Sequence, residues 1–387
     1  MEGRLPGADF LDIESGLAPH ERRKLGQVRA FLAERVLPYA PGWWDREEFP
    51  AHLLVPFGEL EVGTPTRRGY SHLFHGLVIA ELARADASLA TFFMIHHDLF
   101  VESLHAFGTG AQRERYLADA AALRTTGAFA LTEPEHGSDV ARGLGTTARR
   151  DGDHWVINGG KRWIGNGTFC DHLLLWAADE HTRQVRGFIL DMSLPGVAAT
   201  RIEHKAALRI VQNADIVLED VRVAEADRFP GIDSFADANE LLRSSRIMVG
   251  WEAVGQQLAA FDVARAYALE REQFGRPIAS FQLVQQQLVQ MLGNATASMA
   301  MMARLAQLQE RGAADMPQAA LAKAHCSARM RESVALGRAL LGGNGILTDR
   351  RMAKVFADAE AIYTYEGTYE INSLIVGRAV TGISAFS

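Results

Sequence analysis

The sequence contains little cysteine, no long apolar run and no block of like charge. Only two cysteines occur among 387 residues, Cys170 and Cys326, which excludes a disulfide framework and a thiolate zinc site. No apolar stretch is long enough to span a bilayer, so we expect no membrane partner. The net charge of -7, without any cluster of lysine or arginine, argues against nucleic acid and against an anionic membrane surface. These absences favour small-molecule chemistry in a reducing compartment.

The two ends of the sequence show no recognisable targeting signal. The first six residues, MEGRLP, lack a basic segment followed by an apolar one, and the last four, SAFS, are not a peroxisomal signal. We therefore expect a cytoplasmic protein.

Several common catalytic motifs are also missing. The segment 143–145, GLG, lacks the third glycine and the strand-to-helix context of a dinucleotide-binding fold. The pair Gly160-Lys161 does not form a phosphate-binding loop, because Trp155 replaces the leading glycine and Arg162 replaces the hydroxyl that would bind magnesium. No G-x-S-x-G elbow and no Cys/His nucleophile arrangement occurs.

Two adjacent histidines, His96 and His97, precede Asp98 and raise the question of a metal site. Adjacent positions on a helix point in different directions, and no further cluster of ligands follows in the sequence. We therefore predict no metal, and a structural or substrate-lining role for these histidines.

The residues that are present indicate three successive regions. Apolar residues make up 48% of the chain, enough for a large core and two or three domains. Helical spacing of apolar residues gives way near residue 124 to short alternating runs separated by Gly, Asn and Asp, and it returns near residue 236. The sequence thus predicts a mostly α protein with an N-terminal helical domain over 1–123, an antiparallel β-domain over 124–236 and a helical domain over 237–387.

The segment 364–368, TYEGT, places the carboxylate of Glu366 in a tight turn flanked by an aromatic residue. Apolar residues follow at helical spacing and Thr368 can cap the first turn, so Glu366 would lie at a helix N-terminus, partly shielded by Tyr365. A carboxylate held in this way can serve as a base. A surface acid beside a glycine turn is the alternative.

Two segments in the β-rich region could approach a flat cofactor. In 129–139, FALTEPEHGSD, a strand runs into a Pro/Gly turn that exposes backbone amides and the hydroxyls of Thr132 and Ser138. In 160–167, GKRWIGNG, Trp163 precedes glycines at a place where an indole can cover one side of a planar ring. The alternative for Trp163 is a place in the core.

Two segments in the C-terminal region have similar features. The segment 271–278, REQFGRPI, interrupts a helix and brings Arg271 and Gln282 toward one anionic or amide-bearing ligand. The segment 341–346, LGGNGI, ends a helix with glycines that permit close approach to the backbone.

Taken in this order, these five segments resemble the FAD-dependent acyl-CoA dehydrogenase family over nearly the whole chain. The early segment 9–14 and the tail 375–383 look most like the glutaryl-CoA dehydrogenase branch. The resemblance implies that the C-terminal domain is a four-helix bundle. It also implies a homotetramer, or a homodimer of the same type, with FAD at the subunit interface.

The resemblance further assigns roles to individual residues. Glu366 would be the base that removes the α-proton of an acyl thioester while the β-hydride passes to FAD. Substrate contacts would come from Ser138, Arg246, Tyr365 and Gly367. Arg271 and Gln282 would reach FAD from a neighbouring subunit. The positions implied for FAD binding are Phe129, Leu131, Thr132, Ser138, Trp163, Ile164, Gly165, Arg271, Phe274, Gln282, Gly343, Thr368 and Glu370.

Two positions depart from the family pattern. Ala90 stands where glutaryl-specific members carry an arginine for the distal carboxylate, so we predict a neutral acyl chain and no decarboxylation. Apolar lining would come from residues that can equally be helix core, namely Leu89, Phe92, Phe93 and Met94. Gly165 stands where most relatives carry a hydroxyl that bonds flavin N5.

The leading hypothesis is an acyl-CoA dehydrogenase that forms a trans-2-enoyl-CoA and passes electrons to an electron-transfer flavoprotein. An acyl-CoA oxidase or an acyl-carrier-protein dehydrogenase of the same fold is the first alternative. A non-catalytic flavin- or CoA-binding subunit is a more remote one, motivated by Gly165.

Overall fold

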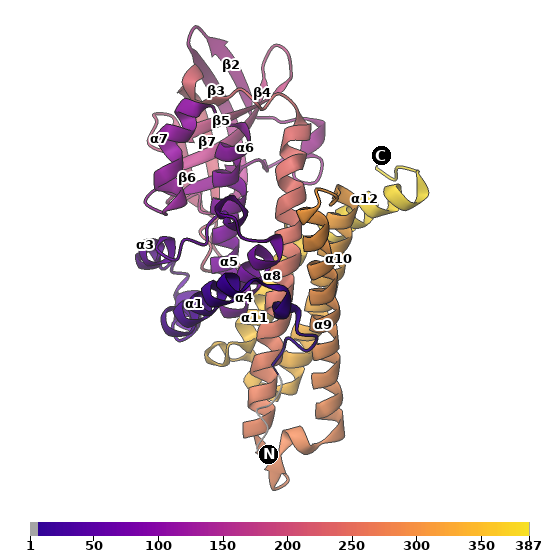
Figure 1. Ribbon diagram of the computed structural model, residues 1–387. Coiled ribbons are helices and arrows are strands. Elements are labelled where there is room, and N and C mark those ends of the chain that lie inside the picture. Colours follow the sequence, from indigo (N-terminus) through magenta and orange to yellow (C-terminus); the bar gives the residue numbers. More distant parts are fainter. Residues whose placement is uncertain (1–6, 387) are drawn as a thin grey trace.

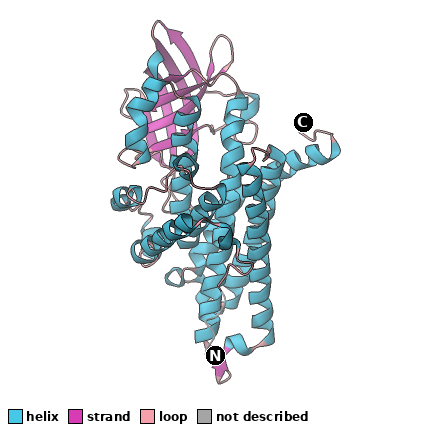
Figure 2. Ribbon diagram, in the orientation of Figure 1, coloured by secondary structure: helices cyan, strands magenta, loops and turns pink. Residues whose placement is uncertain are grey.

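The computed structural model describes residues 7–386 and shows helices, then a sheet, then long helices (Figure 1). The sheet lies at one end of an elongated helical body, as Figure 2 shows. None of the helices in residues 7–386 combines the length and apolar character that a membrane span requires. The fold class expected from the sequence is confirmed.

The N-terminal part is a compact group of helices, and some of them begin at side-chain caps. Ser71 caps α4 by accepting from Phe74 N, and Asp86 caps α5 by accepting from Leu89 N. Both helices are almost wholly buried, and most of their residues are apolar. The elements are η1 (Ile13–Gly16), α1 (Pro19–Arg35), α2 (Ala40–Arg46), η2 (Ala51–Leu53), α3 (Leu54–Gly58), η3 (Pro65–Arg68), α4 (His72–Ala85), α5 (Ala87–Phe93), the π-helix η4 (Met94–Val101), α6 (Glu102–Phe107) and α7 (Gly110–Ala121).

The middle part is a sheet with the order β6-β7-β3-β2-β4-β5-β8, and β1 pairs with β4. The expected antiparallel pairing holds except at β4, which pairs in parallel with β1 and β2. These parallel pairs form because the chain passes through other strands before β4 returns beside β1. The strands are β1 (Gly127–Ala130), β2 (Thr147–Asp151), β3 (His154–Ile164), β4 (His172–Asp179), β5 (Val185–Asp191), β6 (Val197–Arg201), β7 (Ala214–Ala224) and β8 (Arg228–Phe229).

The C-terminal part consists of long helices around α10, which packs against α8, α9, α11 and α12. At 36 residues, α8 is the longest helix described and extends for about 54 Å. It ends at a short hairpin, after which α9 returns antiparallel to it. The elements are α8 (Phe235–Glu270), β9 (Glu272–Gln273), β10 (Arg276–Pro277), η7 (Ile278–Ser280), α9 (Gln282–Glu310), α10 (Met316–Leu340), η8 (Gly342–Ile346), η9 (Thr348–Arg350), α11 (Met352–Thr364) and α12 (Tyr369–Thr381).

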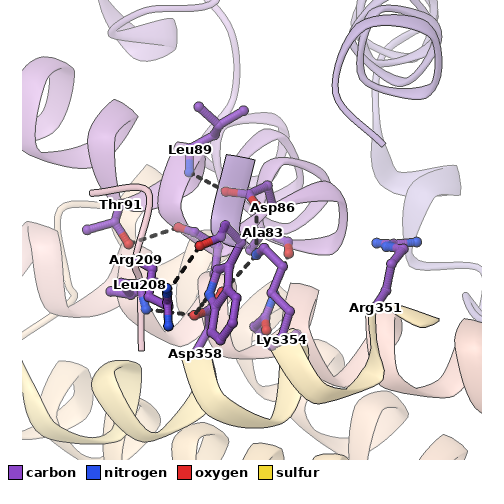
Figure 3. Close-up of polar contacts among 12 residues, drawn as sticks. Ala83, Asp86, Leu89, Thr91, Leu208, Arg209, Arg351, Lys354 and Asp358 are labelled. Carbon is purple, nitrogen blue, oxygen red and sulfur yellow. Dashed lines mark hydrogen bonds and ion pairs between the residues drawn. The ribbon is translucent and has the colours of Figure 1, made fainter. Parts of the chain in front are cut away.

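A buried ionic network joins these three parts (Figure 3). Lys354 Nζ on α11 lies 2.6 Å from Asp86 Oδ2 and 2.7 Å from Asp358 Oδ2. Asp358 Oδ1 in turn accepts from Trp44 Nε1 at 2.8 Å and from the backbone N of Leu208 at 2.6 Å. The network therefore joins α11 to the N-terminal helices and to the loop that precedes β7. At its C-terminal end, α11 leads directly into the TYEGT turn.

Candidate active site

Glu366 lies in the turn between α11 and α12. Thr368 Oγ1 accepts from Ile371 N at 3.2 Å, which confirms the predicted cap of α12. Asn372 Nδ2 donates to the carbonyl of Thr368 at 3.0 Å. Glu366 itself has a φ of 54°, in the left-handed region that costs a residue with a Cβ about 1–2 kcal/mol. Such a conformation persists only where neighbouring groups fix it.

Two buried basic side chains fix the backbone of this turn. Arg246 Nε, from α8, donates to the carbonyl of Glu366 at 3.0 Å. Lys323 Nζ, from α10, donates to the carbonyls of Tyr363 and Gly367, both at 2.8 Å. Tyr363 and Gly367 lie on either side of Glu366, so the single amino group of Lys323 links the two ends of the turn.

The carboxylate of Glu366 is tuned by its surroundings. Ser245 Oγ donates to Glu366 Oε2 at 2.7 Å. Glu366 is half-buried, and its carboxylate is surrounded mainly by protein atoms. This burial raises the pKa of Glu366 above its usual value. Burial also lowers the pKa of Lys323 to about 7, although the nearby Glu366 opposes that shift. A desolvated carboxylate with a raised pKa is a stronger base than one in water.

Tyr365, next to the candidate base, points to a second buried acid, Glu252 of α8. Tyr365 Oη hydrogen-bonds Glu252 Oε2, and Thr91 Oγ1 of α5 donates to Glu252 Oε1 at 2.8 Å. Burial raises the pKa of Glu252 to about 8. The sequence analysis missed Ser245, Glu252 and Lys323. The seven-residue interval from Ser245 to Glu252, which places both on one helix face, was the available signal.

Trp163 is exposed, so the core alternative is wrong. Its side chain is 52% exposed, and its φ is 64°, rare for a bulky residue. The pairing of β3 with β7 is irregular between Lys161 and Ile164, and this bulge turns the indole outward. Asn213 Nδ2 donates to the carbonyl of Trp163 at 3.2 Å and holds the strand end. A strained, exposed indole suits the wall of a planar ligand.

The turn after β1 lies beside the end of β3. Arg162 N donates to the carbonyl of Thr132 at 2.9 Å, which ties the turn to β3. Behind it, the buried Lys161 donates to Glu133 at 2.8 Å and to the carbonyl of Leu131 at 3.2 Å. Ser138 projects from the exposed side of this turn, whereas Thr132 is half-buried. The anchored turn and the exposed indole together fit a flat cofactor with a polar edge.

The side chains of three other predicted cofactor residues near this strand end are covered to different degrees. Leu131 and Ile164 are only 5% and 2% exposed, and Phe129 is half-buried. Gly165 is buried, and a Cβ there would lie 2.3 Å from Cδ1 of Ile95. Ile95 of η4 therefore occupies the space that a hydroxyl-bearing side chain would need.

Four predicted cofactor positions lie at the opposite end of the C-terminal helices from the sheet (Figure 1). At about 1.5 Å per residue, roughly 37 Å of α8 separates Arg246 from Arg271. Arg271 and Gln282 are exposed, and Phe274 is 92% exposed. Gly343 lies in η8, whose Asn344 bonds Tyr267 near the same end of α8. One chain does not bring these residues to Glu366. Glu370 is exposed in the first turn of α12, near Glu366.

The apolar residues of α5 and η4 belong to the core. Leu89, Phe92, Phe93 and Met94 are all at most 8% exposed and pack in the main hydrophobic cluster, so the core alternative holds for them. Ala90, between them, is fully buried.

His96 has the structural role that the sequence suggested. Its Nε2 lies 2.8 Å from the carbonyl of Ala120, and Gly127 N donates to its Nδ1 at 2.9 Å. Burial lowers the pKa of His96 to about 4, so the ring is neutral and fastens η4 to β1. Across residues 7–386, no group of three or more His, Cys, Asp or Glu side chains is arranged to hold a metal ion.

Comparison with known proteins agrees with this architecture. Models of the acyl-CoA dehydrogenase N-terminal, middle and C-terminal domains match residues 19–124, 128–221 and 235–381. Two structures of glutaryl-CoA dehydrogenase from Mycobacterium smegmatis have TM-scores of 0.94 and 0.95 and are 34% and 30% identical. They cover 98% and 99% of this chain and 100% of their own chains, and the second contains FADH2.

Two curated relatives cover most of the chain. The mitochondrial short-chain specific acyl-CoA dehydrogenase of Bos taurus is 29% identical over 370 residues, covering 92% of this chain and 89% of the relative. Subunit CarC of the caffeyl-CoA reductase-Etf complex of Acetobacterium woodii is 30% identical over 339 residues, covering 85% of this chain and 89% of the relative. The chain belongs to the acyl-CoA dehydrogenase family, whose members are FAD-dependent oxidoreductases that act on acyl-CoA.

Proposed function

We propose that this protein converts an acyl-CoA with a neutral acyl chain to the trans-2-enoyl-CoA, with Glu366 as the base. The observation that carries the proposal is the partly desolvated Glu366 carboxylate in a strained turn held by Ser245, Arg246 and Lys323. An α-proton is a poor acid, so its removal needs a base whose position is fixed before the substrate arrives. Gly367 and Tyr365 flank that base, and we place them beside the thioester.

The residues around Trp163 would hold FAD. The exposed indole can cover one face of the ring system, while Thr132 and Ser138 supply hydroxyls for its polar edge and phosphate. When bound, FAD supplies the two-electron acceptor for the hydride that leaves the β-carbon. Leu131, Ile164 and the other residues of the two segments would contribute backbone contacts there.

A neighbouring subunit would supply Arg271, Phe274, Gln282 and Gly343. One FAD molecule is shorter than the helix length that separates these residues from the Glu366 end of α8. They lie among exposed apolar side chains, including Leu283 at 75% and Val289 at 69% exposure on α9. Such a surface is typical of an interface between subunits, which supports a homotetramer, or a homodimer of the same type.

A neutral acyl chain is favoured over glutarate. Ala90 is buried in an apolar cluster, so a second substrate carboxylate next to it would be desolvated without a cation. The short-chain specific relative is consistent with this choice. The caffeyl-CoA reductase-Etf relative supports an electron-transfer flavoprotein as the electron acceptor.

The test compares wild type, Glu366→Gln and a control, Glu360→Gln, which changes an exposed carboxyl on α11. Each FAD-loaded protein is mixed anaerobically with short, branched and long acyl-CoAs, and flavin bleaching is followed. We expect Glu366→Gln to retain FAD and lose at least about 100-fold in reduction rate, while the control matches wild type. Near-normal bleaching of Glu366→Gln would remove Glu366 from its role.

An acyl-CoA oxidase is the second candidate, because Gly165 and Ile95 leave no hydroxyl at the strand end beside Trp163. Oxygen consumption by wild type with acyl-CoA and no other acceptor distinguishes it. Rapid consumption favours the oxidase, and slow consumption favours the dehydrogenase.

A further inference from the structure

One face of α8 holds two consecutive residues of the TYEGT turn. Ser245 and Glu252 are two helical turns apart, about 10 Å along the same face of α8. Ser245 hydrogen-bonds the carboxylate of Glu366 at 2.7 Å, and Glu252 hydrogen-bonds the hydroxyl of Tyr365. The side chains of Tyr365 and Glu366 are thus fixed at separate points on α8, and this restricts the backbone conformation between the two residues.

Glu252 is a buried acid whose hydrogen-bond partners are hydroxyls. Its side chain is fully buried, with Thr91 Oγ1 at 2.8 Å, and Thr91 Oγ1 also lies 3.3 Å from Tyr365 Oη. No cation in the described part of the chain forms an ion pair with it. The charged groups that face it are Asp358 of α11, which disfavours its ionisation, and Lys323 of α10, which favours it.

Burial favours the uncharged form of Glu252 near neutral pH. An ionised carboxylate buried without a cation is costly, whereas a neutral carboxylic acid can share hydrogen bonds with two hydroxyls. Burial raises the pKa of Glu252 to about 8, although the hydrogen bonds from Tyr365 and Thr91 oppose that shift.

We infer that Glu252 is a positioning residue that, as a neutral acid, holds Tyr365 and thereby keeps Glu366 in its left-handed backbone conformation. The inference rests on the proposed function in taking Glu366 as the base. The φ of 54° at Glu366 would relax toward an unstrained region if its neighbours ceased to fix it. Arg246 and Lys323 hold only carbonyls of the turn, whereas Glu252 holds the side chain adjacent to the base.

The kinetic test compares Glu252→Leu, Glu252→Gln and Tyr365→Phe as FAD-loaded proteins. Gln retains an uncharged group that can bond Tyr365, so we expect its rate of flavin reduction at pH 7 to stay within about threefold of wild type. We expect Glu252→Leu and Tyr365→Phe to lose about 10–100-fold in that rate, with KM for the acyl-CoA within about threefold. A Leu variant as fast as wild type, or a Gln variant as slow as Leu, overturns the inference.

A matched control comes from the same helix. Gln257 is fully buried and donates to Ser298 Oγ at 3.1 Å and to the carbonyl of Cys326 at 3.2 Å, away from the turn. Gln257→Leu should lower stability and leave the reduction rate unchanged. If Glu252→Leu does not fold, Tyr365→Phe, which keeps the ring and removes only the hydroxyl, tests the same contact.

The charge state is tested without any reaction. Glu252 has a higher pKa in the folded protein than in the unfolded chain, so its contribution to stability is complete below about pH 4.3 and is lost as the pH rises through about 8. The Tm of wild type should therefore fall relative to that of Glu252→Gln between pH 5 and pH 8. A difference in Tm that stays constant over this range shows an ionised Glu252 and overturns the neutral-acid assignment.

A crystal structure of Glu252→Leu separates this inference from the proposed function. We expect Glu366 to leave the positive φ region and to lose its bond to Ser245. If wild type reduces no acyl-CoA while the structure changes as expected, the proposed function fails and the positioning role stands. If wild type is active while Glu366 is unchanged in the variant, the positioning role fails alone.

Discussion

Replacing Lys354 with methionine should weaken the junction of the three parts of the protein. Lys354 contacts the carboxylates of Asp86 and Asp358 at 2.6 and 2.7 Å, and all three side chains are at most 4% exposed (Figure 3). Removing one member of a buried ionic group costs about 3–5 kcal/mol, because it leaves charge buried without its partner. Both carboxylates keep backbone or indole donors, from Leu89 and Trp44 among others, so the lower end, about 3 kcal/mol, is expected.

The pH dependence of this contribution follows from the lysine. Burial alone would lower the pKa of Lys354, but Asp358 and Asp86 outweigh it and raise the pKa above its usual value. The ionic contribution is therefore complete at pH 7 and is lost only as the pH rises above about 10.5.

The assay is thermal unfolding of the FAD-loaded protein at pH 7 and one protein concentration. A loss of about 3 kcal/mol corresponds to a fall in Tm of roughly 4 °C in a chain of this size. The control, Arg331→Met, breaks the exposed pair of Arg331 with Glu360 and should cost about 1 kcal/mol or less. Adding Asp86→Asn to Lys354→Met should recover part of the loss, since asparagine still caps α5. A Lys354→Met protein no less stable than the control refutes the reasoning.

Two further changes test the cofactor residues. Gly165→Ser places a Cβ 2.3 Å from Cδ1 of Ile95 and should lower stability by about 1 kcal/mol, with Ile95→Val, which removes that methyl, restoring part of the loss. A single Gly165→Ser protein with the Tm of wild type would show that Ile95 does not fill this space. Arg271→Ala changes an exposed residue and should leave the Tm of the FAD-free protein unchanged while weakening FAD binding about 10-fold or more. At an FAD concentration too low to load Arg271→Ala, subunits of Arg271→Ala and Glu366→Gln refolded together should regain activity, and a mixture that stays inactive would place both residues in one subunit's site.

The sequence was sufficient for the parts of the protein that depend on local patterns. Helical and alternating periodicities indicated the order of the three regions, and Thr368 was recognisable as a cap because capping depends on neighbours three residues away. The glycines and proline after α8 marked its end for the same reason. Each of these features is set within one turn of helix or one tight turn of chain.

The rest depends on contacts between distant segments. The parallel pairing of β1 with β4 joins strands that two others separate in the chain. Trp163 is exposed because of a bulge against β7, about 50 residues later, which alternation within β3 does not reveal. Lys323 and Glu252 sit within long helices, and their neighbours in the sequence do not show that each contacts the turn.

The groups that fix the candidate base also belong to the core. Asp358 bonds Lys354 in the ionic network and is one of the charges that keep Glu252 neutral. From Asp358, α11 continues for less than two turns before the chain reaches Tyr365 and Glu366. A loosened junction should therefore disturb the turn as well as the stability, because the strained φ of Glu366 persists only under fixed surroundings. Glu366 is therefore held rigidly by helices whose positions are already fixed by the core, and no separate structural element is needed to position the base.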